Sequence, residues 1–428
     1  MRILLVATYE LGQQPGSLGS AAAHLREQGH DVRAIDVSVD PWDPALADWA
    51  DEVAFSVPMH TATRLARDLA RSIDRPIRCF GLYAAQCSGF AVPVEWDAAL
   101  PARDLLPPLD RYARLAIGDE QRLVGSVLAS HGCAHRCRHC PVPVVYDGRV
   151  QRADETAVLD DIAQLVAAGA QHITFGDPDF LNAPPHSRRI VQAMHERFPE
   201  LTFDCTVKVE HVVRYGGLRY GGLRHADVWT EFAAAGCIFV VSAFESVNDA
   251  ILDRLDKGHT TDDAARAVTV LRDAGIDVRP SWMPFTPWTT RDDLITLLDF
   301  VHEHDLVGSV DPVQYTVRLL LPRGSLLLQH PDLMPHLDEW NDERSTYEWT
   351  SADPTMDELQ RTLATLVEGD GDPVELYARV REVAGAPPVD LSRVTTGRPR
   401  LTETWFCCAE PTELQRSVVT KVSLQSHC

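Results

Sequence analysis

The sequence predicts an α/β protein made of two domains and a mostly helical extension. Short apolar runs typical of buried strands alternate with helical stretches over residues 2–82 and again over residues 123–322. Beyond Pro322 the pattern becomes helical, from about residue 356 to residue 384. Because alternating strands and helices favour parallel sheets, we expect a doubly wound, Rossmann-like domain followed by a partial barrel. A length of 428 residues fits this division.

The first domain is expected over residues 1–90. Its strands are predicted at residues 2–8, 31–37, 53–57 and 77–82, and its helices at residues 18–28 and 61–72. Gly29 directly follows the first of these helices, as glycine commonly does at helix ends. A proline-rich linker, residues 91–120, leads to the next domain.

The second domain is expected over residues 121–325 as a partial (βα)6 barrel. Its six strands are predicted at residues 123–130, 171–176, 201–209, 237–244, 277–283 and 313–321. In parallel sheets of this kind the functional groups gather at the carboxyl ends of the strands. Residues 326–428 form the predicted extension, which ends in a cysteine-containing tail.

Composition and charge limit the partners of the protein. Apolar and charged fractions of 45% and 24% are ordinary for globular proteins, and no apolar run is long enough to cross a bilayer. A formal net charge of -22 repels phosphate backbones, and lysine and arginine do not cluster. The first residues lead directly into a strand, without a signal-peptide cleavage site. We therefore expect a soluble cytoplasmic protein with a small-molecule substrate and no nucleic-acid or membrane partner.

Three of the ten cysteines lie on one loop that follows the first predicted barrel strand, namely Cys133, Cys137 and Cys140. Cysteines in a cytoplasmic protein indicate metal binding or thiol chemistry rather than a disulfide framework. A four-iron cluster normally takes four cysteines, so three leave one iron open for an outside ligand. The alternative is a structural zinc site completed by a histidine of the same loop. The candidates for that role are His131, His135 and His139.

The spacing of these cysteines, CxxxCxxC, resembles the signature of the radical S-adenosylmethionine (SAM) superfamily, and later segments over residues 120–325 follow the order of that family. The resemblance implies an enzyme with a [4Fe-4S] cluster on Cys133, Cys137 and Cys140, whose open iron binds SAM. It also implies reductive cleavage of a carbon–sulfur bond of SAM, with an electron donor such as flavodoxin or ferredoxin.

The same resemblance indicates SAM-binding residues at the ends of three further strands. They are Gly176 and Asp177, Glu245 and Ser246, and Arg279 and Ser281. The first pair stands where the family has a Gly-Gly-Glu-like segment near the SAM amino group, with a plain turn as the alternative. The second pair looks like the family's Glu-Ser step near the ribose. The third pair is a candidate for the SAM carboxylate, and a surface ion pair is the alternative for the arginine.

The first domain resembles, in position and βαβ pattern, the cobalamin-binding domain fused to many radical SAM enzymes. Its Asp-x-His-x-x-Gly motif is missing, and His24 and His30 do not fit that spacing. No histidine is therefore expected to ligate cobalt. Cobalamin is kept as a cofactor that the sequence does not favour.

The tail contains two adjacent cysteines, Cys407 and Cys408, in the string Cys-Cys-Ala-Glu-Pro. Adjacent thiols rarely bond to each other without strain, but they suit a soft, thiophilic ion. Two small buried apolar residues are the alternative. The string resembles the tail of a radical SAM group named for it, whose members include the enzyme that forms hydroxyarsinothricin.

This second resemblance implies transfer of the 3-amino-3-carboxypropyl group of SAM to a thiophilic acceptor such as arsenite. Cys408 is expected to bind the acceptor, with Cys407 beside it and Cys428 as a candidate third sulfur. The alternatives are cobalamin-dependent radical methylation, 5'-deoxyadenosyl-radical chemistry on a carbon substrate in natural-product biosynthesis, and a thiol-based metal sensor. The acidic composition and the absence of a DNA-reading motif disfavour the sensor.

Overall fold

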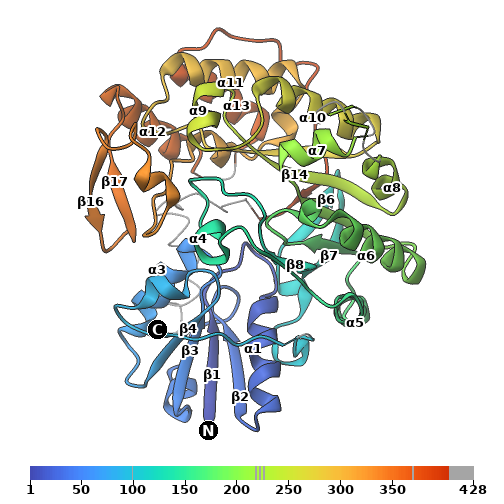
Figure 1. The fold of residues 1–428 in the computed structure, drawn as a ribbon, viewed down its shortest axis with the longest axis vertical. Helices are drawn as coiled ribbons and strands as arrows, with labels where there is room; N and C mark the ends of the chain where they lie inside the picture. Colours follow the sequence, from blue (N-terminus) through green and yellow to red (C-terminus); the bar gives the residue numbers. More distant parts are fainter. Residues whose placement is uncertain (99, 217–218, 221–222, 225–226, 369–370, 404–428) are drawn as a thin grey trace.

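The computed structural model of the protein describes the chain in six stretches. They are residues 1–98, 100–216, 219–220, 223–224, 227–368 and 371–403. Two parallel sheets organise these residues, one in the lower part of Figure 1 and one curled in its upper part. The predicted α/β class is therefore confirmed.

The first sheet contains five parallel strands among the described residues, in the order β2-β1-β3-β4-β5. Their bounds are β1 (Arg2–Ala7), β2 (Asp31–Asp36), β3 (Glu52–Ser56), β4 (Ile77–Phe80) and β5 (Val92–Pro93). The connecting helices are α1 (Gly16–Glu27), α2 (Pro44–Trp49) and α3 (His60–Ala70). Doubly wound sheets with this strand order bind ligands at the carboxyl ends of their strands.

The apolar residues of β1 explain why helices cover both faces of this sheet. Successive residues of a strand point to opposite faces. Ile3 and Leu5 pack in one core with Leu18 of α1, whereas Leu4 belongs to a second core that includes Ala66 of α3. A strand that is apolar at every position is therefore buried on both sides.

The second sheet has the order β15-β14-β11-β10-β7-β6-β18. Its parallel strands are β7 (Glu120–Val127), β10 (His172–Phe175), β11 (Thr202–Thr206), β14 (Cys237–Glu245) and β15 (Asp277–Trp282). Two antiparallel strands, β6 (Arg114–Ile117) and β18 (Arg400–Leu401), extend the edge beyond β7. β5 and β6 both come from the segment predicted as a linker, so each sheet takes one short strand from it.

Helices and two small hairpins connect the strands of the second sheet. The helices are α4 (Val142–Tyr146), α5 (Glu155–Ala167), α6 (Pro184–Arg197), α7 (Val209–Arg214), α8 (Val228–Ala234), α9 (Asp249–Arg254), α10 (Thr261–Asp273) and α11 (Arg291–Glu303). The hairpins pair β8 (Ser130–Gly132) with β9 (Val150–Arg152), and β12 (Arg219–Tyr220) with β13 (Leu223–Arg224).

The sixth predicted barrel strand, residues 313–321, differs from the prediction. Its first part is a 3-10 helix, Pro312–Thr316, and its second part makes a single parallel bridge between Arg318 and Phe285. Its apolar residues, including Val317, are buried in a core that also contains Tyr9 of the first domain. The apolar pattern of this segment therefore reflects burial between domains rather than strand pairing.

The predicted helical extension consists of a hairpin and two helices among the described residues. The hairpin pairs β16 (Leu337–Asn341) with β17 (Thr346–Trp349), and the helices are α12 (Pro354–Leu366) and α13 (Pro373–Ala384). Tyr377 of α13 donates a hydrogen bond of 2.5 Å to the Leu298 carbonyl of α11. The extension thus packs onto the helical layer of the barrel. Cys407, Cys408 and Cys428 lie outside the described residues.

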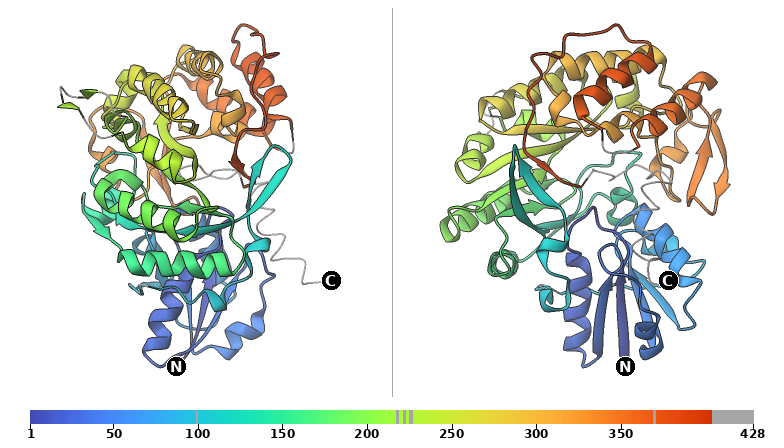
Figure 2. Two further views of the ribbon diagram at one scale, coloured as in Figure 1. Left: turned by 90° about the vertical axis from the view of Figure 1, so that its right-hand side faces the viewer. Right: turned by 180° about the vertical axis from the view of Figure 1, so that it is seen from behind.

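The strands of the first sheet run from the N-terminus towards the barrel domain, so their carboxyl ends face it (Figures 1 and 2). One apolar core joins the two domains there, with Tyr9 and Met59 packed against Ile251, Leu255 and other residues of the second domain. No helix in the described part of the chain is long and apolar enough to span a membrane.

Candidate functional site

The loop that carries the three predicted cluster cysteines follows β8 at the carboxyl end of β7. Gly132 begins the loop with a φ of +78°, and a Cβ at this position would lie 2.2 Å from the Arg149 carbonyl oxygen. Only glycine fits such a position without a backbone shift. The backbone amide of Ala134 donates to Asn182 Oδ1 at 3.0 Å, and that of Arg138 donates to the Leu255 carbonyl at 2.8 Å. The loop is therefore fixed from two sides.

The three thiols of this loop fit the ligand set of a four-iron cluster with one open iron. Cys133 and Cys137 are buried, with exposed fractions of 8% and 7%, and Cys140 is half-buried. Burial, more than any other cause, raises the pKa of the Cys133 thiol. A buried thiol of this kind becomes a thiolate when a metal ion replaces its proton.

The end of β14 places a buried ion pair beside the same loop. Lys257 Nζ lies 3.0 Å from Glu245 Oε1, and His139 Nε2 lies 3.4 Å from the same oxygen. Burial opposes ionisation of Glu245, but Lys257 and His139 outweigh it and lower the pKa of the carboxyl group. Burial also opposes the charge of Lys257, yet the charges of Glu245 and Cys137 raise its pKa. A lysine cation is thus held close to the cluster loop.

The pair predicted near the SAM amino group, Gly176 and Asp177, follows β10 directly. Asp177 is 1% exposed, and its carboxylate accepts hydrogen bonds from the Ala129 amide at 2.9 Å and the Ser130 hydroxyl at 2.6 Å. Burial raises the pKa of Asp177 to about 6, although these hydrogen bonds oppose the increase. The carboxylate therefore holds the strand end that precedes the cysteine loop, and its contact with SAM stays a prediction.

Arg279, predicted for the SAM carboxylate, contacts protein groups instead. Its guanidinium lies 2.9 Å from Asp311 Oδ2 and donates to the Pro399 carbonyl at 3.3 Å. Both side chains of this ion pair are largely buried. The contact is therefore an interior ion pair and not the surface ion pair that is the alternative interpretation of Arg279. The role of Arg279 towards SAM stays a prediction.

The two predicted serines differ in their surroundings. Ser246 is buried, and its hydroxyl accepts a hydrogen bond of 3.1 Å from the Asn248 amide, which turns the chain after β14. Ser281 is half-buried on β15. Both remain predicted SAM ligands, as does Glu245 with the contacts described above.

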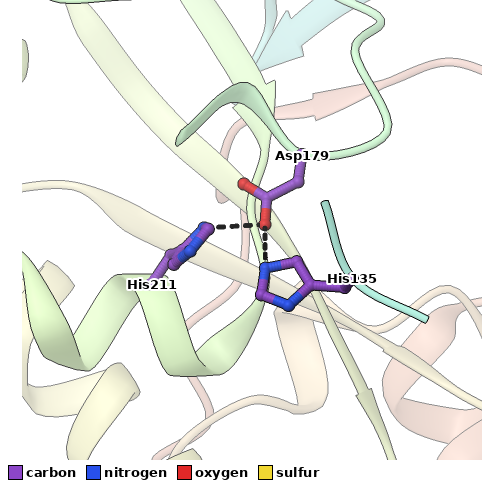
Figure 3. A group of neighbouring side chains, drawn as sticks. All are labelled: His135, Asp179 and His211. Atoms are coloured by element: carbon purple, nitrogen blue, oxygen red, sulfur yellow. Dashed lines mark ion pairs between the residues drawn. The ribbon is translucent and has the colours of Figure 1, made fainter. Parts of the chain in front are cut away.

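Sequence reasoning missed several polar residues near the cysteine loop. Asn182 Oδ1 lies 3.7 Å from the Cys133 sulfur, and it also accepts the hydrogen bond from the Ala134 amide. His211 of α7 and Asp179 after β10 converge on His135 of the loop (Figure 3). His135 is a candidate zinc ligand from the sequence, but its partners are 44 and 76 positions away. No spacing pattern could have linked them.

Residues 127–301 match the sequence family described as the radical SAM superfamily. This range contains the cysteine loop and the parallel strands from β10 to β15. The chain therefore contains a radical SAM superfamily domain and is an enzyme. A comparison with curated proteins finds no match.

The solved structures with a similar fold include the following two. The cobalamin-dependent S-adenosylmethionine radical enzyme OxsB, solved with aqua-cobalamin bound, has a TM-score of 0.63 and 14% sequence identity, over 85% of this chain and 66% of that chain. The radical S-adenosylmethionine methyltransferase TsrM from Kitasatospora setae, solved with tryptophan substrate and a SAM analog, has a TM-score of 0.55 and 18% identity, over 76% of this chain and 74% of that chain.

These likenesses concern the fold. Sequence identities this low do not carry an activity from one protein to another. The chain also covers slightly less than two thirds of OxsB, at 66% of its length. The reaction and the substrate of this enzyme are therefore matters of proposal.

Proposed function

We propose that this enzyme cleaves SAM reductively at a [4Fe-4S] cluster on Cys133, Cys137 and Cys140 and transfers the 3-amino-3-carboxypropyl group to trivalent arsenic or another thiophilic acceptor. The proposed reductive cleavage of SAM rests on the fixed cysteine loop at the carboxyl end of β7, which lies within the residues that match the radical SAM superfamily. When bound, the cluster supplies the electron that breaks a carbon–sulfur bond of SAM.

The protein groups around the loop place a cation beside two of its sulfurs. The cation of Lys257 lies close enough to Cys137 and Cys140 for their charges to raise its pKa. Glu245, at 3.0 Å from Lys257, holds this cation in place. The ion pair therefore positions charge for the cluster rather than reacting itself.

SAM is expected to bind between the cysteine loop and the ends of β10, β14 and β15. Gly176, Ser246 and Ser281 are the small predicted ligands at these strand ends. Asp177 and Arg279 are each engaged with protein groups, so we expect them to fix the strand ends that form the pocket.

The position of Glu403 supports a role for the adjacent cysteines of the tail. The hydroxyl of Tyr9, after β1, donates a hydrogen bond of 3.0 Å to Glu403 Oε1. Glu403 is thus held where the carboxyl end of the first sheet faces the barrel. Cys408 follows five positions later, and five residues reach at most about 18 Å. The described residues thus lead up to the face that the two sheets share, five positions before Cys408 in the sequence.

The transfer is balanced in atoms and electrons. A carbon–sulfur bond of SAM breaks and a carbon–arsenic bond forms, with methylthioadenosine as the leaving product. As(III) is oxidised to As(V) by taking up the alkyl group, so the electron used for cleavage is returned overall. Thiolates of Cys407 and Cys408 hold the soft As(III) and release the harder As(V) product.

Cobalamin-dependent radical methylation is the second candidate. OxsB and TsrM have both been solved with cobalamin, and both share the fold of this chain. The carboxyl end of the first sheet, where doubly wound domains bind ligands, also faces the barrel here. Against this candidate stands the missing Asp-x-His-x-x-Gly motif.

The products of SAM distinguish the candidates. We would reconstitute the cluster anaerobically, reduce it, add SAM with or without arsenite, and identify the products by mass spectrometry. Methylthioadenosine that accumulates with arsenite, together with an arsenic-bearing amino acid, supports the first candidate. A methylated product that requires added cobalamin supports the second. 5'-Deoxyadenosine that forms regardless of arsenite contradicts the arsenic proposal and points to a carbon substrate.

Two cysteine variants test the role of the tail. Cys408→Ala should keep the iron content and SAM cleavage but lose the arsenic product. Cys87→Ala, which alters a buried cysteine of the first domain, is the matched control. This variant should keep the iron content, SAM cleavage and the arsenic product. Unchanged product formation by Cys408→Ala would refute the role of the tail.

A further inference from the structure

Three side chains from separate elements converge beside the cysteine loop (Figure 3). His135 comes from the loop itself, Asp179 follows β10, and His211 lies on α7. Asp179 Oδ2 is 2.8 Å from His211 Nδ1 and 3.7 Å from His135 Nε2. All three atoms lie within 4.8 Å of one another. We refer to these residues as the His-Asp-His cluster.

The three converging atoms are buried and have no hydrogen-bond partner among the described residues. Asp179 Oδ2 and His211 Nδ1 are close, but their geometry is not that of a hydrogen bond. The other carboxylate oxygen of Asp179 accepts from the Leu181 amide at 3.0 Å, so the side chain is held with Oδ2 towards the histidines. Buried polar atoms in folded proteins nearly always have a hydrogen-bond partner, and three buried nitrogen and oxygen atoms that lack one and face one point fit a bound cation.

The surroundings also fit a metal site. The second ring nitrogen of His135, Nδ1, lies 3.9 Å from Glu210 Oε2. Glu210 in turn contacts Lys208 Nζ at 3.7 Å and Arg214 at 2.9 Å. A carboxylate near the far nitrogen of a histidine is the usual outer partner that orients a metal-binding imidazole.

We propose that His135, Asp179 and His211 bind one divalent transition-metal ion, separate from the iron-sulfur cluster. Two imidazoles and one carboxylate are ligands that Zn²⁺ and Fe²⁺ accept. Ligand atoms around a tetrahedral zinc ion lie about 3.4 Å apart, so small side-chain rotations would complete the site. Three protein ligands leave at least one position for water or for an oxygen- or nitrogen-containing group of the substrate.

This site lies next to the predicted SAM-binding region, because His135 stands between two cluster cysteines in the sequence and Asp179 is two residues beyond Asp177. A substrate bound to the open position would therefore be held near the SAM-derived radical. The metal site itself does not depend on which acceptor the enzyme uses.

Zinc binding by matched variants tests the proposal. We would reconstitute the cluster, load each protein with Zn²⁺, remove loosely bound metal, and measure iron and zinc per chain by mass spectrometry. All proteins would carry Cys407→Ser and Cys408→Ser, which removes the adjacent tail thiols as zinc ligands. Asp179→Asn and His211→Phe should each lose about one zinc equivalent at unchanged iron content. Asp48→Asn, an exposed carboxylate of α2, is the matched control and should retain it.

Equal zinc content in all four proteins would overturn the proposal. A second measurement guards against variants that fail to fold. Co²⁺ bound to the protein with intact Asp179 and His211 should give a high-spin signal in electron paramagnetic resonance, with pulsed measurements showing coupling to two imidazole nitrogens. Cobalt without imidazole coupling would also overturn the proposal.

Discussion

The two parallel sheets present their carboxyl ends to the same interior but differ in how their polar groups are satisfied. At the first sheet, Asp36 accepts a hydrogen bond of 2.9 Å from the Tyr112 hydroxyl, and the Thr8 hydroxyl donates to the Ala62 carbonyl at 3.1 Å. At the second sheet, buried thiols lie beside the Glu245–Lys257 ion pair and the His-Asp-His cluster.

This difference shows that strand topology alone does not tell which sheet carries the reacting groups. Both sheets have the arrangement that places ligands at strand ends, and among the described residues the cysteine loop, the Glu245–Lys257 ion pair and the His-Asp-His cluster all lie at the second. The predictions below probe the two sheets in order of decreasing effect, and the first two compare matched changes at both.

The largest difference is expected for cysteine removal. Cys133→Ala should reduce iron from about four atoms per chain to nearly none and abolish SAM cleavage, because two thiols cannot hold the cluster. Cys87→Ala, at the first sheet, should leave the iron content unchanged. Iron and sulfide analysis after reconstitution measures the effect. Comparable iron loss in both variants would mean that the cysteine loop is not the cluster site.

The second difference concerns buried and partly exposed ion pairs. Glu245→Gln leaves the Lys257 charge buried without its partner, which should cost about 3–5 kcal/mol of stability. Glu52→Gln removes a partner from Arg78, whose side chain is 35% exposed, and should cost about 1 kcal/mol or less. Urea unfolding of the cluster-free chain measures both. Equal costs would contradict a buried, charged pair at β14.

The third difference is a pH dependence. Burial raises the pKa of Asp177 from 3.8 to about 6, so its contribution to stability is fully present below pH 3.8 and is lost as the pH rises through 6. The loss is roughly 3 kcal/mol. Asp177→Asn has no charge to bury, so its stability relative to the unchanged chain should increase by this amount. Urea unfolding at about pH 4 and about pH 7 tests this, and parallel pH profiles would refute it.

The smallest effect is expected for the hydrogen bond that anchors the tail. Tyr9→Phe removes the contact with Glu403 and should cost about 1 kcal/mol, because the carboxylate is partly accessible and finds water. Urea unfolding measures the cost. A loss above roughly 3 kcal/mol would show that Glu403 is deeply buried in solution and that this anchor matters more than its contacts indicate.

The sequence predicted those features that depend on local patterns. Apolar runs predicted the strands β1 to β4, the parallel barrel strands β7, β10, β11, β14 and β15, and the two helices of the extension, and the cysteine loop follows from spacing. The apolar run over residues 313–321 predicted a strand wrongly, because burial between two domains needs the same residues as burial in a sheet. Only the position of Tyr9 and Met59 reveals this.

Side-chain contacts between residues that are far apart in the sequence could not be predicted from the sequence alone. Arg279 of β15 contacts Asp311, 32 positions later, and His211 after β11 contacts Asp179 after the neighbouring strand β10. Each partner is a common residue without a distinctive neighbour in the sequence. Asp179 and His211 follow the neighbouring strands β10 and β11, so their proximity depends on strand order, which hydrophobic periodicity does not encode.

The pairing of β6 with β18 has a consequence for folding. Arg400 pairs with Ala116, so 284 positions separate the two strands, and β6 is an open edge until β18 arrives. At about 5–20 residues per second, ribosomal synthesis of the intervening chain takes roughly 15–60 s. An exposed edge strand invites pairing with other chains. We therefore expect a period of aggregation risk at this edge that ends when Arg400 and Leu401 pair with β6.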